Sequence, residues 1–254
     1  MNLLKKIFRK KRPFGPFQIF EDDIFVASYP KSGNTWLRFI LARLMAPSES
    51  TISFRNIDDY VPDLYRCRHF IDSVQKRPRF IKIHEPHIED YGKAVYIYRD
   101  GRDAMISFYH YFKQSKKFDG TFTDFLKAVD NFWCGSWMDH VTSALNYAEN
   151  NPGKIIFLKY EDLLINPGPR VEQLAEFCQL PYTSSKVEEA IQLTSFSELK
   201  KIESQFGPEE LDQNNVEFFR AGKQKQWKEV FSSEQRTLFE RKAGYLLQQL
   251  GYEI

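Results

Sequence analysis

The hydrophobic positions of this chain form short apolar runs that alternate with longer amphipathic stretches. Four runs have the length and composition of buried strands: 24–27, 80–84, 94–98 and 155–159. Apolar side chains three or four positions apart predict helices over 34–44, from the end of the third run to 112, over 135–150 and over 170–178. Ser232 and Gln235 form a capping-box pattern that predicts a last helix reaching Leu250.

Strands that alternate with helices predict an α/β fold with three layers, in which helices cover both faces of a central parallel sheet. Residues 46–78 are polar and irregular, which predicts loops and short helices near the mouth of a pocket. No repeat or Pro/Gly/Ser-rich linker divides the chain. We therefore expect one domain over residues 21–254, preceded by a basic, flexible arm of residues 1–20.

Composition and charge narrow the class of protein. With 254 residues, of which 42% are hydrophobic and 16% aromatic, the chain can bury the core of a domain. A net charge of +2 does not fit a general nucleic-acid binder, and no apolar run suits a secretory signal or a membrane span. The three scattered cysteines suit a reducing compartment and have no metal-ligand spacing. We expect a cytoplasmic protein without a metal site.

The arm holds most of the charge asymmetry. Residues 1–12 contain six Lys and Arg and no acidic residue, and their apolar side chains Leu3, Leu4, Ile7 and Phe8 have helical spacing. Two interpretations stay open for this segment. It is either a solvated terminus or a peripheral contact with an anionic membrane surface.

The clearest candidate for chemistry follows the first strand, in the run Tyr29-Pro-Lys31-Ser-Gly-Asn-Thr-Trp36. A strand, a Gly-containing turn and the start of a helix bring backbone N–H groups and the helix dipole onto an anion. Lys31 adds a positive charge and the hydroxyls add donors. We therefore expect a phosphate-bearing ligand here. The other interpretation is an ordinary strand-to-helix turn with a solvated lysine.

The order of residues in this loop separates two kinds of phosphate site. A Walker A loop requires Gly-x-x-x-x-Gly-Lys-Ser/Thr, whereas here Lys31 precedes Gly33 and the turn has no earlier Gly. The loop instead resembles Tyr-Pro-Lys-Ser-Gly-Thr-Thr-Trp, the phosphosulfate loop of the sulfotransferases that use 3′-phosphoadenosine 5′-phosphosulfate (PAPS). Only one position departs from it. The resemblance implies that the loop residues bind PAPS: Lys31, Ser32, Gly33, Asn34, Thr35 and Trp36.

A second strand end offers another phosphate candidate. Arg99 follows the strand 94–98, and Ser107 lies eight residues further on, in a helix that aims it back at the same crevice. A guanidinium fork matches two phosphate oxygens at once. From the residues alone, Arg99 is as well explained by an ion pair with a neighbouring aspartate. The resemblance to sulfotransferases implies that Arg99 and Ser107 hold the 3′-phosphate of PAPS.

The candidate base is His84, which ends the strand 80–84. Strand alternation places Lys82 on the same face. A histidine with an ordinary pKa of about 6.5 accepts a proton from a hydroxyl at neutral pH, although a single His at a strand end is usually structural. Sulfotransferases have Lys-x-His-x-Pro at this point. The resemblance therefore implies that His84 is the general base and that Lys82 helps to hold the transferring group.

Three later patches match the family in order. The resemblance implies that Tyr160 contacts the adenine of PAPS and that Thr194 and Ser195 supply a hydroxyl. It also implies that Trp36 and Phe196 stack on the adenine, whereas core packing is the commoner role of such rings. The third patch, Phe219-Arg220-Ala221-Gly222, looks like the element that closes over the 3′-phosphate.

That third patch departs from the family pattern in two places. Ala221 replaces a Lys, and Lys225 stands where a second Gly is usual. The grip on the 3′-phosphate is therefore expected to be altered, with Lys223 or Lys225 as candidates to compensate. The following segment lacks the dimer-contact motif of animal cytosolic members, so the sequence leaves the oligomeric state open.

The resemblance covers about residues 22–230 and implies transfer of a sulfuryl group from PAPS to a hydroxyl, or an amine, of a small-molecule or lipid acceptor. The catalytic residues that it implies are Lys31, Lys82, His84 and Ser107. Two alternatives stay open: a P-loop nucleotide kinase or NTPase, and a non-catalytic nucleotide-binding protein. Several aromatic residues either indicate a ring-bearing acceptor or are packing residues: Tyr60, Tyr65, Phe70, Phe118, Phe122 and Trp133.

Overall fold

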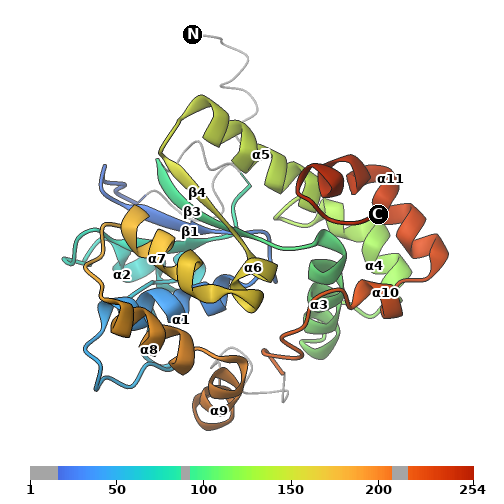
Figure 1. The fold of residues 1–254 in the computed structure, drawn as a ribbon. Coiled ribbons are helices and arrows are strands. Elements are labelled where there is room, and N and C mark those ends of the chain that lie inside the picture. The colour runs from blue at the N-terminus through green and yellow to red at the C-terminus, as the bar shows by residue number, and fades with distance from the viewer. Residues whose placement is uncertain (1–16, 87–91, 208–216) are drawn as a thin grey trace.

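A computed structural model describes residues 17–86, 92–207 and 217–254. Its centre is a four-stranded parallel sheet in the order β2-β1-β3-β4 (Figure 1). The strands are β1 (Ile24–Ala27), β2 (Phe80–Ile83), β3 (Lys93–Tyr98) and β4 (Ile155–Lys159). The four predicted strands and their parallel arrangement are confirmed, and His84 lies one residue beyond β2 rather than within it.

The helices follow the predicted alternation with some additions. They are α1 (Asn34–Met45), η2 (Ile57–Asp59), α2 (Leu64–Ile71), α3 (Gly101–Gln114), α4 (Phe122–Ala128), η4 (Val129–Asn131), α5 (Trp137–Asn150), α6 (Tyr160–Ile165), α7 (Pro167–Phe177), α8 (Ser184–Leu193), α9 (Phe196–Phe206), α10 (Trp227–Val230) and α11 (Ser233–Gln249). The capping box before α11 is confirmed. The periodicity did not predict α4, α6, α8, α9 and α10.

The sheet is covered on both faces because its strands are apolar at every position except Lys82, Lys93 and Lys159. Phe25 and Ala27 of β1 face a cluster that includes α3, α4, α5 and α11. Ile24 and Val26 face the opposite cluster, formed with α1, α7 and α8. The expected three-layer α/β architecture is confirmed, with the two sets of helices on opposite sides of the sheet (Figure 1).

The described part of the predicted arm is already packed against the domain. Phe17 is buried in the cluster that covers one face of the sheet. The carbonyl of Gln18 accepts a hydrogen bond from Arg79 (2.7 Å). The basic residues 1–12 lie outside the described residues, so the membrane interpretation of that segment stays a prediction.

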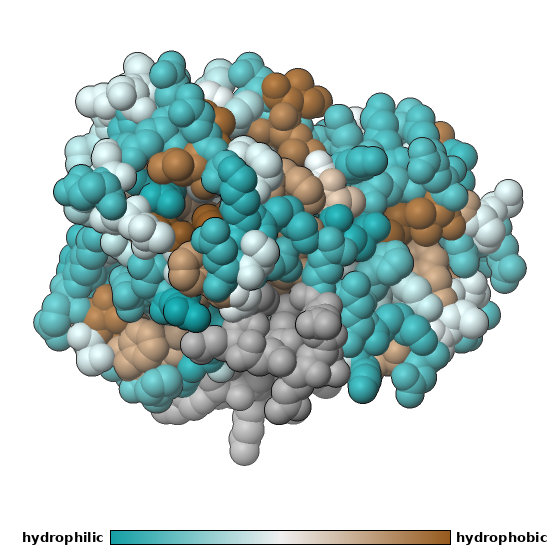
Figure 2. Space-filling model, turned by 90° about the horizontal axis from the view of Figure 1, so that it is seen from below, coloured by the Kyte–Doolittle hydropathy of each residue, from teal (hydrophilic) through white to brown (hydrophobic). Residues whose placement is uncertain are grey.

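The surface seen in Figure 2 is mainly hydrophilic, with hydrophobic side chains in separate patches. Among the described residues, no helix is long and apolar enough to cross a membrane.

Candidate functional site

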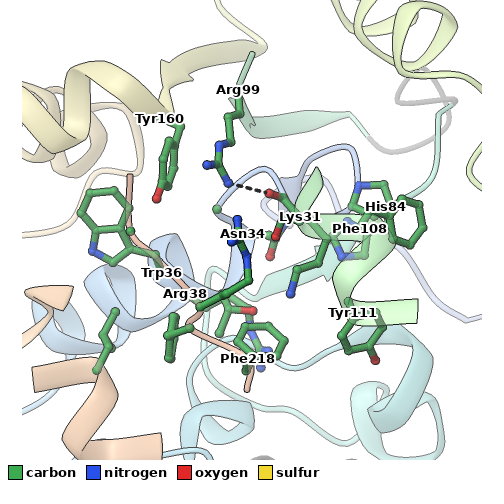
Figure 3. A pocket seen from close by; sticks show the side chains of 18 of the residues that line it. Lys31, Asn34, Trp36, Arg38, His84, Arg99, Phe108, Tyr111, Tyr160 and Phe218 are labelled. Atoms are coloured by element: carbon green, nitrogen blue, oxygen red, sulfur yellow. Dashed lines mark hydrogen bonds between the residues drawn. The ribbon is translucent and has the colours of Figure 1, made fainter. Parts of the chain in front are cut away.

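A cavity of about 570 Å³ lies where β1, β2 and β3 end. Figure 3 shows Lys31, His84 and Arg99 pointing into it from three different segments of the chain. Sixteen of the eighteen residues expected at the site line this cavity: Lys31, Gly33, Asn34, Thr35, Trp36, Lys82, His84, Arg99, Ser107, Tyr160, Thr194, Phe196, Phe219, Arg220, Ala221 and Gly222. The fold therefore gathers residues that are almost 200 positions apart in the sequence.

Two of the expected residues do not line the cavity. Ser32 is fully buried, and its hydroxyl has no hydrogen-bond partner among the described residues. Ser195 caps α9 by accepting a hydrogen bond from the backbone of Glu198 (3.5 Å). Thr194 does reach the cavity, but its hydroxyl donates to the carbonyl of Ala190 (2.7 Å). The hydroxyls of Thr194 and Ser195 are therefore used within the protein in this structure.

The loop between β1 and α1 is built for close approach of an anion. Lys31 and Gly33 both have left-handed backbone angles, with φ of 65° and 102°. A Cβ on Gly33 would lie 2.7 Å from the ring of Tyr160, so only glycine fits there. No side chain caps α1, which leaves N–H groups of its first turn for a ligand at the positive end of the helix dipole.

The ammonium of Lys31 lies against two aromatic rings. It is 3.9 Å from the ring centre of Phe218 and 4.8 Å from that of Tyr111 (Figure 3). Burial, together with the positive charge of Arg99, lowers the pKa of Lys31 to about 7. Among the described residues, no carboxylate lies within 4.0 Å of this ammonium. An anionic ligand is therefore the natural partner of Lys31.

Two guanidinium groups form a second cationic region in the same cavity. Arg99 lies over the ring of Tyr160 (4.4 Å) and donates to the carbonyl of Lys223 (2.8 Å). Burial and the nearby charge of Arg99 lower the pKa of Arg220. The Nε–H groups of both arginines are buried without a hydrogen-bond partner among the described residues. Two converging arginines with unused donors fit a phosphate group.

Arg99 also lies beside a neighbouring aspartate, as its alternative interpretation as an ion-pair partner expected. Its guanidinium is 3.7 Å from the carboxylate of Asp103. That carboxylate is shared, because Asp103 also accepts a hydrogen bond from the backbone N–H of Trp227 (3.0 Å). One partial ion pair does not use up the five donors of an arginine.

His84 is held as a neutral base. Its Nδ1–H donates to the carbonyl of Ser28 (2.8 Å), which leaves the lone pair on Nε2. Burial and the positive charge of Lys82 lower the pKa of His84 well below its ordinary value. Asn34 supports this arrangement by donating to the Ser28 hydroxyl (3.2 Å) and to the carbonyl of Val26 (3.0 Å). The ring can therefore accept a proton at neutral pH.

Lys82 lies on the same side of the sheet as His84, as the strand alternation predicted, and both line the cavity. Its ammonium is paired with Asp63 (2.8 Å). Although burial opposes the charge of Asp63, Lys82 and Arg38 lower the pKa of its carboxyl group. Asp63 was not predicted from the sequence, because its contact with Lys82 depends on how α2 packs beside β2.

The end of the cavity near His84 is lined with aromatic rings. Two of the expected aromatics, Tyr65 and Trp133, lie there with ring centres 5.2 Å apart. The other four do not line the cavity: Tyr60, Phe70, Phe118 and Phe122. Further lining residues were missed: Phe54, Phe108, Tyr111, Phe112 and Phe218. Three of these are in α3, and one of them, Tyr111, lies four residues after Ser107, a helical spacing that was available in the sequence.

The segment after residue 216 closes the other side of the cavity. Gly222 has φ of 59°, and a Cβ there would lie 2.4 Å from the ring of Phe196. Lys225 also has a left-handed conformation (φ 60°), which favours glycine, the residue that the family pattern has at this position. Neither Lys223 nor Lys225 lines the cavity, so neither compensates for Ala221 in this structure.

No group of His, Cys, Asp and Glu side chains in the described residues is suited to hold a metal ion.

Comparisons with known proteins agree on one family. The family model described as "Sulfotransferase domain" matches residues 21–251. A flavonol 3-sulfotransferase of Flaveria bidentis is 31% identical over 247 residues, which cover 86% of this chain and 79% of that protein. Sulfotransferase 1A1 of Bos taurus is 27% identical over 263 residues, with 94% and 88% of the two chains covered.

Solved structures show the same fold. A mouse sulfotransferase complexed with PAP, the 3′,5′-bisphosphate, superposes with a TM-score of 0.72 and 24% identity, over 92% of this chain and 90% of that one. A putative steroid sulphotransferase of Arabidopsis thaliana superposes with a TM-score of 0.56 and 26% identity, over 85% and 81% of the two chains.

Proposed function

This chain belongs to the sulfotransferase family and is a PAPS-dependent sulfotransferase, and on that premise we propose how its cavity divides the work. The cations around Lys31, Arg99 and Arg220 bind the donor, and the aromatic end beside His84 binds the acceptor. The observation that carries the proposal is the neutral His84, whose Nε2 lone pair faces a cavity that also holds these cations. The family does not favour the nucleotide-kinase alternative.

The donor half of the cavity offers one partner for each part of PAPS. The unused Nε–H groups of Arg99 and Arg220 suit the 3′-phosphate, with the hydroxyl of Ser107 nearby on the same wall. Trp36 and Phe196 line the cavity beside Tyr160 and supply aromatic faces for the adenine. The uncapped start of α1 suits the 5′-phosphosulfate. Solved relatives complexed with PAP support this division.

Transfer forms one bond to sulfur and breaks another. The acceptor oxygen attacks the sulfur, the bond from sulfur to the 5′-phosphate oxygen breaks, and PAP leaves with the bonding electrons. His84 takes the acceptor proton on Nε2. Lys31 stabilises the negative charge that develops on the leaving phosphate. Lys82 is paired with Asp63 and lines the same cavity as His84, two residues further on. Its ammonium can therefore stabilise the sulfuryl oxygens.

We propose a small aromatic hydroxyl compound as the acceptor class. The rings of Tyr65, Phe108 and Trp133 around the base suit a planar apolar molecule, and a relative named flavonol 3-sulfotransferase supports this choice. Relatives named cytosolic sulfotransferases support a cytoplasmic location. Contact with a membrane or a lipid acceptor would depend on residues 1–12, which lie outside the described residues.

The test is transfer of labelled sulfur from [³⁵S]PAPS to a panel of phenols, aliphatic alcohols and amines, without added metal. We expect labelled aryl sulfate, and strongly reduced transfer by His84→Ala. Labelled product from alcohols or amines but not phenols would refute the acceptor class. Full transfer by His84→Ala would refute the base assignment.

A further inference from the structure

The segment that closes over the donor half of the cavity has little structure of its own. Residues 217–226, here called the donor loop, contain no helix or strand, yet six of them line the cavity: Phe218, Phe219, Arg220, Ala221, Gly222 and Gln226. Within the loop, the side chain of Gln226 accepts a hydrogen bond from Arg220 (2.6 Å) and donates to the carbonyl of Lys223 (3.1 Å). A loop with so little internal structure must also be positioned by contacts from outside. Glu203 of α9 accepts a hydrogen bond from the backbone N–H of Phe219 (3.3 Å), and Arg99 donates to the carbonyl of Lys223 (2.8 Å). Further contacts hold the end of the loop at α10.

The anchor at the end of the loop is Trp227, which is 4% exposed. Its backbone N–H donates to Asp103 (3.0 Å), the same carboxylate that lies beside Arg99. Its ring lies 3.6 Å from the guanidinium carbon of Arg102. The end of the loop is therefore fixed against the first turn of α3, on which the phosphate-binding side chains also depend.

Arg102 is itself held on three sides. It is fully buried, and Asp100 accepts hydrogen bonds from both its Nε (3.0 Å) and its Nη2 (2.9 Å). Glu240 of α11 accepts from Nη1 (2.7 Å). The third partner is the backbone carbonyl of Glu253, which accepts from Nη2 (2.6 Å).

The residues after α11 connect these parts. The carboxylate of Glu253 pairs with Lys228 of α10 (2.8 Å) and lies 3.6 Å from Lys225 of the donor loop. The hydroxyl of Tyr252 donates to Glu161 (2.9 Å), whose other oxygen accepts from the backbone N–H of Asp100 (3.0 Å). In Figure 1 this part of the chain lies beside α10 and α11.

We propose that Tyr252 and Glu253 are positioning residues for the donor: they hold the donor loop and the start of α3 in the arrangement that grips the 3′-phosphate. Neither residue lines the cavity, so both act through other residues. Ala221 makes such support more important, because it leaves Arg220 as the one basic side chain that the donor loop contributes to the lining of the cavity. The inference rests on the proposed function, in which PAPS occupies this cavity.

A pair of nucleotides separates this role from a general loss of stability. PAP carries the 3′-phosphate and adenosine 5′-monophosphate (AMP) does not, so the ratio of their dissociation constants measures the 3′-phosphate grip. The test measures both constants by calorimetry for the wild type and for a Tyr252→Phe/Glu253→Ala double variant. Glu229→Ala is the matched control, because Glu229 is an exposed acid on α10 that does not line the cavity.

We expect the double variant to weaken PAP binding about tenfold and to change AMP binding less than about twofold, as removal of one hydrogen bond and one exposed ion pair allows. In the double variant the KM for PAPS rises together with the dissociation constant of PAP, while kcat and the KM for the acceptor stay near wild type. Exchange of the charges in Lys228→Glu/Glu253→Lys restores part of the PAP affinity that Glu253→Lys alone loses. Glu229→Ala behaves as the wild type.

Three outcomes would overturn the inference. Unchanged dissociation constants for both PAP and AMP in the variants would show that these residues do not support the 3′-phosphate grip, while the proposed function would stand. An equal loss for both nucleotides would show a general structural role. A wild type that binds PAP no better than AMP would refute the proposed function as well. Should the double variant fail to fold, the single variants Tyr252→Phe and Glu253→Gln answer the same question.

Discussion

The low pKa of Lys31 makes donor binding depend on pH in a defined direction. Before the donor binds, burial and Arg99 hold the pKa of this ammonium at about 7. An anionic phosphate beside it favours the charged form and raises the pKa again. Binding of PAP above pH 7 must therefore take up a proton, and PAP affinity must fall as the pH rises.

The size of the effect follows from the two protonation states. With a pKa of 7, about 0.9 of the Lys31 amines are neutral at pH 8, so PAP binding takes up about 0.9 proton. Between pH 7.5 and 9 the dissociation constant of PAP rises about 25-fold, provided that the bound state keeps Lys31 charged. The phosphates of PAP, with second pKa values of about 6, are almost fully ionised over this range and add little. His84 stays neutral because its pKa is lowered.

Calorimetry of PAP binding at pH 8, in two buffers with different ionisation enthalpies, measures the proton uptake directly. Lys31→Met is the critical variant, since it removes the titrating amine from the ring of Phe218. We expect the uptake to disappear in Lys31→Met and to remain in His84→Ala. Wild-type binding without proton uptake at pH 8, or the same uptake in Lys31→Met, would refute the reasoning.

Three further results are expected. His84→Ala lowers kcat by about 10²- to 10⁴-fold and leaves PAP affinity within about twofold of wild type, because the base acts on the acceptor and not on the donor. Stopped assays measure kcat and calorimetry measures PAP affinity. A large loss of PAP affinity would contradict the assignment of His84 as the base. Gly222→Ala weakens PAP binding about tenfold or more, because a Cβ at φ 59° would lie 2.4 Å from the ring of Phe196; Gly244→Ala, whose Cβ would meet no atom closer than 3.8 Å, is the control. Lys31→Met raises the melting temperature of the donor-free protein, and more at pH 6 than at pH 9. The pKa of Lys31 is about 7 in the folded chain and about 10.4 in the unfolded one, so the cost of burying its charge is full below pH 7 and decreases as the pH rises. An equal rise in melting temperature at both pH values would contradict this explanation.

Much of the candidate site was predictable because its signals are local. The residues that identify the phosphosulfate loop all lie within the eight positions from Tyr29 to Trp36, and most of them line the cavity. The period of two in a strand placed Lys82 and His84 together, and the period of 3.6 in a helix aimed Ser107 inward. The same helical period contained Tyr111, which lines the cavity four residues further on and was overlooked.

Other features arise only when distant segments meet. Ser32 and Ser195 match the family pattern, yet packing turns the first into the interior and uses the second as a helix cap. The partner of Lys82 is Asp63, nineteen residues away. No periodicity reports such a contact, because the direction of a side chain is set by its own backbone while its neighbour is set by the packing of another element.

The sequence by itself therefore predicted the α/β class, the phosphosulfate loop and the candidate base His84. Tertiary structure alone decided the charge states on which the chemistry depends. The pKa of Lys31 is low first because the amine is buried, and second because Arg99 is brought close to it from 68 residues away in the sequence. Burial and the distances between charges set a pKa, and both belong to the folded chain and not to any short stretch of it.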